Sequence, residues 1–426
     1  MGSFSTPLSG LTAAQGQLQS VSNNLANIDT DGYKDQDLTF SDIFTQTGVA
    51  NGAGDPIQTG FGVAISSTDA NFTEGSLNAT GTSSNMALSG NGFFLVQGSN
   101  ASPDFTRAGD FTTNNAGQIT TPSGELLLGY PAVGGVVNTN AALQPMQVGS
   151  VTSAAVASTT FGITANLDSA TGVGGTTNNS VSVYDSLGSA HILSVTYTMT
   201  APGAWTYDVT MPSTDLTPPG AGATTSVGSG TLNFDSSGVL VSTEATGATA
   251  TTAPSAGVAL TIPPTGTTLA DGAAPMALNW NLETAGNSIT QTRSASGQSA
   301  TTTNGYPSGT LETYVVQPDG TIEGTFTSGN SLALGQVAVA TFANTQGLVS
   351  TGNNNYQPTG ASGTAVVGLA GTGGRGTVIG GSVEESNVDI ATEFAKMIVA
   401  QQAYSANAKS ITTFNQVSQA TIAMLQ

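Results

Sequence analysis

The sequence predicts a multidomain α+β protein with a helix at each end and a strand-rich body between the helices. Apolar residues recur at helical spacing near both termini, and apolar and polar residues alternate through the middle of the chain. Segments rich in glycine and proline separate these patterns. At 426 residues, the chain is long enough for roughly two to four domains, each with its own core.

The first 28 residues predict an amphipathic helix. Thr6 is a candidate N-cap, and Pro7 would then occupy the first turn, where a missing N–H costs nothing. Apolar residues follow at alternating spacings of three and four, which is the pattern of a heptad seam. The seam consists of Leu11, Ala14, Leu18, Val21, Leu25 and Ile28.

The stretch SNNLANIDTDGYK, residues 22–34, ends this helix with residues that do not favour helices, among them Asn23, Asn24 and Asn27. One interpretation of this run is that it ends the helix, because asparagine and aspartate favour turns and Gly32 can adopt positive φ just past the helix. A calcium loop is the alternative, because Asp29, Asp31, Asp35 and Asp37 follow closely. An EF-hand loop needs glycine at its sixth position and glutamate at its twelfth. Here Gly32 is fourth and Phe40 is twelfth, which favours the helix stop.

A second, longer helix is predicted within residues 384–426. Ser386 and Asp389 resemble a capping box. The acidic residues Glu384, Glu385 and Glu393 lie where a helix dipole favours anions, which explains them more simply than acid–base catalysis. Steps of four and three from Ile390 define a second seam: Ile390, Phe394, Met397, Gln401, Tyr404, Ala408, Ile411, Asn415, Ser418, Ile422 and Leu425. The two seams predict a coiled coil with each other or with other copies, or else an ordinary packed helical face.

The middle of the chain predicts strands. Residues 193–199 and 205–211 alternate around Pro202-Gly203 and predict an antiparallel hairpin with one buried face. GNGFFLVQG, residues 90–98, predicts a buried strand, and residues 311–326 predict a hairpin that turns at Pro318-Asp319-Gly320. The segments 131–160, 212–230 and 243–275 are typical of loops or domain junctions.

Composition excludes several classes of function. The net charge is −20, and the six cations are scattered: Lys34, Arg107, Arg293, Arg375, Lys396 and Lys409. Nucleic-acid binding and attachment to anionic membranes are therefore not expected, and no apolar run is long enough to span a bilayer. The chain has no cysteine, and its N-terminus lacks the basic and apolar regions of a cleaved secretory signal. The acidic, lysine-poor surface nevertheless suggests an extracellular protein.

No motif predicts an enzyme or a cofactor. His191 is the only histidine and lies beside a strand pattern, so a packed or surface strand residue is favoured over a zinc ligand or a catalytic base. GTGGRG, residues 371–376, lacks the P-loop lysine and is interpreted as a flexible joint.

Both ends of the chain resemble the bacterial flagellar rod and hook family. SGLTAAQGQLQSVSNNLANIDTDGYK is similar to its N-terminal signature, and VEESNVDIATEFAKMIVAQQAYSANAKSI to its C-terminal signature. GNGFFLVQ, FTRAGDFTTNNAGQI and LLLGYP resemble its first rigid domain, and VYDSLGSAHILSVTYT resembles the extra middle domain found in hooks. PDGTIEGTFTSGNSLALGQVAVATFANTQGLVSTGNNNYQPTGASG resembles the returning half of the rigid domain.

The resemblance implies a nested architecture, in which the chain runs outward through successive domains and then returns. We expect an inner coiled-coil domain from residues 1–28 with 384–426, and an extended connector from 29–70 with 364–383. A first β-rich domain would comprise 71–150 with 296–363, and 151–295 would form an outer inserted domain.

The function implied is that of a structural subunit of the flagellar hook. Copies would polymerise into a curved hollow tube that acts as a universal joint and transmits motor torque to the filament. The implied assembly residues of the first helix are Leu11, Leu18, Val21, Leu25 and Ile28 with the amides Asn23, Asn24 and Asn27. Those of the second helix are Ile390, Phe394, Met397, Gln401, Tyr404, Ala408, Ile411, Ile422 and Leu425. Gly32, Tyr33 and Lys34 form the implied connector turn. The implied partners are further copies, the distal rod, hook cap and hook–filament junction proteins, and the flagellar type III export apparatus, which needs no cleaved signal.

Two alternatives remain open. A distal rod protein of the same family would lack the insertion at about 151–295. A secreted β-rich adhesin or carbohydrate-active enzyme would need an ordinary export signal or a convergent carboxylate site, and the sequence indicates neither.

Overall fold

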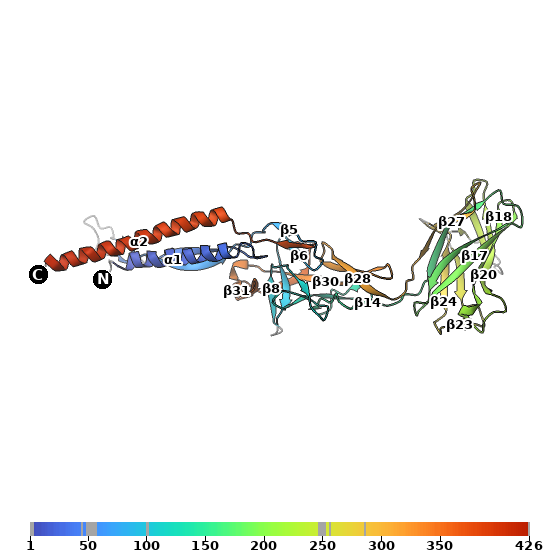
Figure 1. The fold of residues 1–426 in the computed structure, drawn as a ribbon, viewed down its shortest axis with the longest axis horizontal. Coiled ribbons are helices and arrows are strands. Elements are labelled where there is room, and N and C mark those ends of the chain that lie inside the picture. The colour runs from blue at the N-terminus through green and yellow to red at the C-terminus, as the bar shows by residue number, and fades with distance from the viewer. Residues whose placement is uncertain are drawn as a thin grey trace. The chain divides into compact units, whose positions relative to one another are not determined.

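The computed structural model describes residues 4–43, 46–47, 58–98, 102–245, 253–254, 257–284 and 287–424. The chain divides into two compact units. Unit 1 consists of Met1–Ser150, Thr313–Gly324 and Leu332–Gln426, and unit 2 of Val151–Glu312 and Thr325–Ser331. Strands dominate both units, and the α-helices of the described residues, α1 and α2, lie near the two ends of the chain (Figure 1). The structure thus confirms a mainly-β protein with a helix near each end.

Helix α1 (Ser5–Ala26) begins slightly before its predicted start. Thr6 lies inside the helix, so its predicted role as N-cap is wrong. The residue that precedes the helix, Phe4, provides no side-chain cap. Pro7 is buried within the first turn, where the backbone needs no N–H donor.

Helix α2 (Ile390–Met424) begins later than predicted. Asp389 caps it, because its Oδ1 accepts a hydrogen bond from the backbone N of Thr392 at 2.7 Å. The predicted cap Ser386 is wrong, since it lies too far upstream to reach the first free N–H groups of the helix. No helix among the described residues combines the length and the apolar character needed to cross a membrane.

The two helices pack side by side and antiparallel (Figure 1). Three contacts show that the helices are antiparallel, because later residues of α1 contact earlier residues of α2. These contacts are Asn24 with Glu393, Gly10 with Asn407, and Phe4 with Phe414. A Cβ at Gly10 would lie 2.8 Å from the Asn407 amide, so glycine allows this close approach. Unit 1 therefore joins the beginning and the end of the chain in one helical pair.

The predicted connector 29–70 contains a ribbon that lies along α1. Strands β1 (Gln36–Asp42) and β4 (Val63–Ala70) pair antiparallel with a bulge at Thr39/Phe40. The Ser20 hydroxyl donates to the Gln36 carbonyl at 2.6 Å and ties the ribbon to the helix. The shorter strands β2 (Gln46–Thr47) and β3 (Gln58–Thr59) also pair.

The β-rich part of unit 1 is built around β7 (Phe93–Gln97), which is buried on both faces. Phe94 and Val96 belong to one apolar cluster, and Phe93 and Leu95 to another on the opposite face. The predicted buried strand is therefore confirmed. The other strands are β5 (Leu77–Ala79), β6 (Met86–Ser89), β8 (Pro103–Thr106), β9 (Thr112–Thr113), β10 (Ile119–Thr120), β11 (Leu126–Val133), β12 (Val136–Val137), β13 (Gln144–Pro145), β30 (Ser331–Thr341), β31 (Val349–Gly352), β32 (Asn355–Gln357), β33 (Val366–Leu369), β34 (Thr377–Gly380) and β35 (Ser382–Glu384).

Strands β28 (Gly309–Val316) and β29 (Thr321–Phe326) form the predicted hairpin at Pro318-Asp319-Gly320. Gly320 has φ +84°, a conformation that glycine adopts without the strain a Cβ brings. The Gln317 backbone N donates to the Thr321 carbonyl at 2.8 Å and closes the turn.

Unit 2 contains two sheets that enclose one apolar core. One sheet has the order β22-β24-β15-β26-β25 with β27 on β15, and the other β16-β17-β18-β20-β21. The predicted hairpin at 193–211 is confirmed as β17 and β18, and all eight of its alternating apolar side chains are buried. His191 is a buried residue of β17, which confirms the prediction of a packed strand residue.

The strands of unit 2 are β14 (Thr152–Ser153), β15 (Thr160–Asp168), β16 (Thr176–Tyr184), β17 (Ala190–Ala201), β18 (Ala204–Pro212), β19 (Leu216–Thr217), β20 (Thr224–Phe234), β21 (Leu240–Ala245), β22 (Val258–Ile262), β23 (Thr268–Leu269), β24 (Met276–Asn281), β25 (Glu283–Thr284), β26 (Asn287–Thr292) and β27 (Gly297–Thr303). Because β27 pairs along β15, the expected end of the inserted domain at residue 295 is too early. The compact unit extends to Glu312.

Candidate functional site

The candidate site is the pair of terminal helices with the buried polar groups that hold them to the rest of unit 1. In α1, the predicted seam residues Ala14 and Val21 are buried. The remaining seam positions Leu11, Leu18, Leu25 and Ile28 are half-buried. The seam face of α1 is thus largely covered within its own chain.

Most of the predicted seam of α2 is uncovered within its own chain. Its half-buried members are Met397, Ala408 and Ile411. Its exposed members are Ile390, Phe394, Gln401, Tyr404, Asn415, Ser418 and Ile422, and Leu425 lies outside the described residues. The side chains of α2 that are buried are Glu393 and Ala400.

Further apolar residues of α2 are exposed although the seam does not include them. Ile398, Val399 and Val417 are 54%, 61% and 58% exposed. Ile398 and Val399 are adjacent, so their side chains point about 100° apart around the helix. The continuous apolar run of residues 397–400 is the sequence signal for these positions, and it does not fit a single seam.

Asn24 has a different role from the one expected, because it makes hydrogen bonds inside its own chain. Its Nδ2 donates to Glu393 Oε2 and to the Gln36 carbonyl, both at 3.1 Å. Its Oδ1 accepts from the Tyr33 hydroxyl at 3.1 Å and from the Gln36 backbone N at 3.0 Å. These bonds use both donors and both acceptor positions of the amide, so Asn24 has none left for a neighbouring copy.

The other two amides make fewer contacts. Asn23 Nδ2 donates to the Tyr33 hydroxyl at 3.0 Å, and Asn27 Nδ2 donates to the Asn23 carbonyl at 2.8 Å. Burial, together with the charges of Asp35 and Glu393, raises the pKa of Tyr33 to about 12. Its hydroxyl therefore remains a hydrogen-bond donor at neutral pH.

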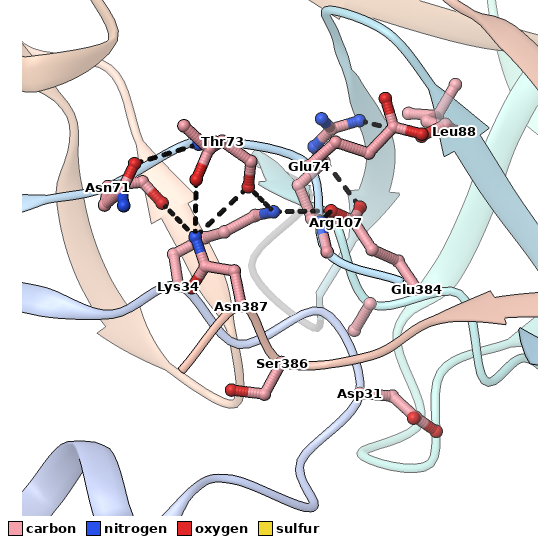
Figure 2. Close-up of polar contacts among 12 residues, drawn as sticks. Asp31, Lys34, Asn71, Thr73, Glu74, Leu88, Arg107, Glu384, Ser386 and Asn387 are labelled. Carbon is pink, nitrogen blue, oxygen red and sulfur yellow. Dashed lines mark hydrogen bonds and ion pairs between the residues drawn. The ribbon is translucent and has the colours of Figure 1, made fainter. Parts of the chain in front are cut away.

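A buried ion network lies where the start and the end of the chain meet in unit 1 (Figure 2). Lys34 Nζ lies 2.5 Å from Glu384 Oε1, and both side chains are 0% exposed. Lys34 Nζ also donates to the Thr73 carbonyl at 2.7 Å. Arg107 Nε lies 3.6 Å from Glu384 Oε2, and the Arg107 guanidinium donates to the Gly90 carbonyl at 2.9 Å. Glu384 thus faces two cations from different segments, and its predicted role at a helix start is wrong.

Burial lowers the pKa of the Lys34 ammonium, and the neighbouring Glu384 carboxylate opposes this shift. Gly32, two residues earlier, has φ +68°, as expected for the helix stop. A Cβ at Gly32 would lie 2.5 Å from the Ala108 backbone N, so only glycine fits there. The connector turn Gly32, Tyr33 and Lys34 therefore fastens α1 to the β-rich part of unit 1.

Asn387 holds the segment before α2. Its Oδ1 accepts from the Asp35 backbone N at 2.8 Å, and its Nδ2 donates to the Asn71 and Thr73 carbonyls at 2.8 and 3.1 Å (Figure 2). Nearly two turns into the helix, Lys396 Nζ bridges Asp37 Oδ1 at 2.6 Å and Glu393 Oε1 at 2.8 Å. Both carboxylates raise the pKa of Lys396 against the opposing effect of burial. These contacts fix where α2 begins relative to α1.

Family models of the bacterial flagellum match most of the chain. They are described as Flagella basal body rod protein over residues 4–34, Flagellar hook protein FlgE/F/G D1 domain over 87–162, Flagellar basal body protein FlaE D2 domain over 157–306, and Flagellar basal body rod FlgEFG protein C-terminal over 379–424. The first and last of these include the two helices and the connector turn.

Curated relatives extend the similarity over the whole chain. The flagellar hook proteins FlgE of Salmonella typhimurium and Escherichia coli are each 34% identical to it over 97% of this chain and 98% of their own. FlgE of Treponema pallidum is 32% identical over 97% of both chains. Since the similarity covers both helices, the buried ion network and the strand-rich insertion alike, the chain belongs to the FlgE family of flagellar hook proteins.

Proposed function

We propose that this member of the hook protein family is a structural subunit of the bacterial flagellar hook and that its terminal helices are the inner contact between copies. The names of its relatives support a structural, non-enzymatic role. The main support for the terminal helices as the contact between copies is the exposure of large apolar side chains around α2.

The distribution of these side chains favours contacts on more than one side of the helix. Glu393 and Ala400 are buried, whereas Ile398 and Val399 point away from them in two directions. A helix with apolar residues on several sides is normally buried on those sides. Burying each such side chain contributes about 1.5–3 kcal/mol. A repeated, head-to-tail lattice of copies would cover them, whereas a single paired dimer would cover only one face.

The proposed architecture is nested. A coiled-coil inner domain would consist of residues 1–28 with 384–426, and 29–70 with 364–383 would connect it to a β-rich domain of 71–150 with the returning strands. The outer domain would begin near Val151 and end near Glu312. Its support is the division of the chain, in which unit 2 is inserted between segments of unit 1 in the sequence.

The proposed assembly is a curved hollow tube that acts as a universal joint between motor and filament. Only 8% of the residues are charged, so few strong ion pairs would form between neighbouring outer domains, and those domains could exchange contacts during rotation. The proposed partners are other copies and the distal rod, hook cap, hook–filament junction and type III export proteins. The proposed location is the extracellular part of the flagellum, reached without a cleaved signal.

Two substitutions on α2 test the inner contact. Ile398→Asp and Val399→Asp each place a carboxylate on an exposed apolar position, so the monomer should melt as the wild type does, within about 0.5 kcal/mol. In a tube the same carboxylate would be buried without a partner, which costs several kcal/mol for every copy. Electron microscopy of polymerisation trials should show tubes for the wild type and none for either variant.

Ile398→Leu is the matched control, because it keeps the apolar volume at the same place and should still form tubes. Normal tubes from both aspartate variants would show that α2 is not the inner contact. Straight or closed oligomers from the wild-type protein would contradict the proposed hook function itself.

A further inference from the structure

The only histidine of the chain lies in unit 2 among three carboxylates. His191 is 5% exposed, and its Nδ1 lies 2.9 Å from Asp215 Oδ2. Its Nε2 lies 3.1 Å from Oδ2 of Asp185, whose side chain is 0% exposed. Asp271 completes the group: its carboxylate, that of Asp185 and the imidazole each offer a ligand atom within 4.8 Å of the others.

The backbone holds these side chains in place. Asp185 Oδ1 accepts from the backbone N of Leu187 at 2.8 Å and of Ser189 at 2.9 Å, which leaves Oδ2 directed at the histidine. The loop that carries Asp271 follows β23 and is tied back to its neighbours: the Ala270 backbone N donates to the Asp215 carbonyl at 2.9 Å. The Ala274 backbone N donates to Ser186 Oγ at 3.2 Å. The fold therefore brings three separate segments, which carry Asp185, Asp215 and Asp271, to one imidazole.

The charge of this cluster is unbalanced. Arg293 is the one lysine or arginine in residues 151–312, and it lines a different hollow together with Asp235 and Gln291. Among the described residues, no lysine or arginine forms an ion pair with Asp185, Asp215 or Asp271. Even a protonated imidazole leaves an excess of two negative charges, which suits a divalent cation.

We propose that His191 Nε2, Asp185 Oδ2 and an Asp271 carboxylate oxygen form a binding site for a divalent transition metal of the Zn²⁺ or Mn²⁺ class. Asp215 does not bind the ion in this arrangement. It accepts a hydrogen bond from His191 Nδ1–H and so fixes the tautomer that presents Nε2 to the metal, as carboxylates do for histidine ligands elsewhere.

The geometry needs an adjustment at its widest separation. Ligand atoms at about 2.0–2.2 Å from one tetrahedral ion lie about 3.3–3.6 Å apart, so a separation of up to 4.8 Å must shorten by about 1 Å. Asp271 is exposed, so rotation of its side chain can make this adjustment, and the exposed carboxylate gives the ion a route from solvent. Three protein ligands leave one or more coordination positions for water. The site differs from the Cys- and His-rich zinc sites that a chain with one histidine and no cysteine cannot build.

A bound ion would hold the turn before β17, strand β17 itself and the loop after β23 at one place. We therefore expect metal binding to stabilise unit 2 and to leave unit 1 unchanged. The inference is independent of hook assembly, since it concerns unit 2 in the monomer.

The test uses the full-length chain without a histidine tag. Calorimetric titration with Zn²⁺ and with Mn²⁺ should show one ion bound per chain for at least one of them at micromolar affinity. Because the chain has one histidine, a single set of imidazole NMR signals reports directly on Nε2, and these signals should shift on binding. Asp271→Asn should weaken binding at least tenfold, and Asp215→Asn should weaken it about 10–100-fold through the orientation of His191.

Asp235→Asn is the control, since that carboxylate caps a turn of the same unit away from the cluster and should leave affinity unchanged. If neither ion binds stoichiometrically to the folded chain, or binding leaves the imidazole signals in place, the proposal is wrong. Equal affinity of the wild type and Asp271→Asn would also overturn it, whatever the effect on stability.

Discussion

The two units achieve stability in different ways. Unit 2 has an apolar core that includes Trp205, Trp280, Tyr197 and Tyr207, all drawn from one nearly continuous stretch of chain. Unit 1 also has apolar clusters, but its two ends of chain are held together by the buried ion network of Lys34, Glu384 and Arg107. The Lys34–Glu384 contact joins residues that are 350 positions apart in the sequence. Unit 2 is therefore complete once its own segment is present, whereas unit 1 needs both ends of the chain.

This difference matters for an assembling subunit. The free energy of a buried ion pair depends strongly on every partner, because a charge that loses its partner remains buried. The folded state of unit 1 is thus sensitive to whether the first 34 residues and the segment before α2 are docked together. Substitutions in the network should affect unit 1 alone.

The largest effect is expected for Glu384→Gln. It removes the carboxylate that faces Lys34 and Arg107, so two buried cations lose their counter-ion. We expect unit 1 to lose about 3–5 kcal/mol of unfolding free energy. Differential scanning calorimetry should show its transition at lower temperature and that of unit 2 unchanged. Glu385→Gln is the matched control, since this neighbour is exposed and its loss should cost less than about 0.5 kcal/mol. A parallel fall of both transitions would refute the separate origins of stability.

A smaller effect separates Asn24 from Asn23. Asn24→Ala leaves the Tyr33 hydroxyl, the Gln36 backbone and Glu393 short of partners in a buried place, which should cost about 1–3 kcal/mol. Asn23→Ala removes two hydrogen bonds of an exposed residue, one of them a long bond of 3.4 Å from Asn27 Nδ2, and should cost less than about 1 kcal/mol. Urea denaturation of unit 1 measures both. Equal losses would mean that the four bonds of Asn24 contribute little.

Local patterns in the sequence were enough for the elements with a clear period. Helical spacing gave α1 and α2, and alternation gave β17 and β18, because each signal lies within a few turns or residues. The family resemblance added the outer insertion, although its end was set too early because β27 carries no apolar alternation and is exposed throughout.

The buried polar contacts were beyond local reasoning. Glu384 was interpreted as part of a helix start because acidic residues cluster there, while its actual partner is Lys34 at the other end of the sequence. Asn24 resembled an assembly residue because no nearby pattern shows that Glu393 would approach it. The Asp185–His191–Asp271 group likewise depends on how separate segments of unit 2 meet in the folded chain. Such contacts form only when distant segments meet in the folded chain, and no local pattern in a single sequence shows which segments will meet.

The smallest expected effect concerns Asp31, on the turn that follows α1. Burial raises the pKa of this carboxyl, and the nearby charges of Asp110 and Glu385 raise it further. A carboxyl whose pKa is higher in the folded state favours folding when protonated, and this contribution is lost as pH rises through the folded pKa. At neutral pH, ionised Asp31 therefore opposes the folding of unit 1. Asp31→Asn removes that charge.

Since solvent screens a partly exposed carboxylate, the gain for Asp31→Asn should be only about 0.3 kcal/mol at pH 7, or roughly 1 °C in the unit 1 transition. The gain should vanish below about pH 3.5, where the carboxyl is protonated in both the folded and the unfolded chain. Asp29→Asn provides the comparison, because Asp29 is exposed on the same turn and its substitution should change stability little at either pH. Thermal melting of both variants at pH 7 and pH 3 tests this explanation. A stability gain that persists at pH 3 would come from packing of the new amide. It would show that repulsion by the Asp31 carboxylate does not destabilise the turn that follows α1.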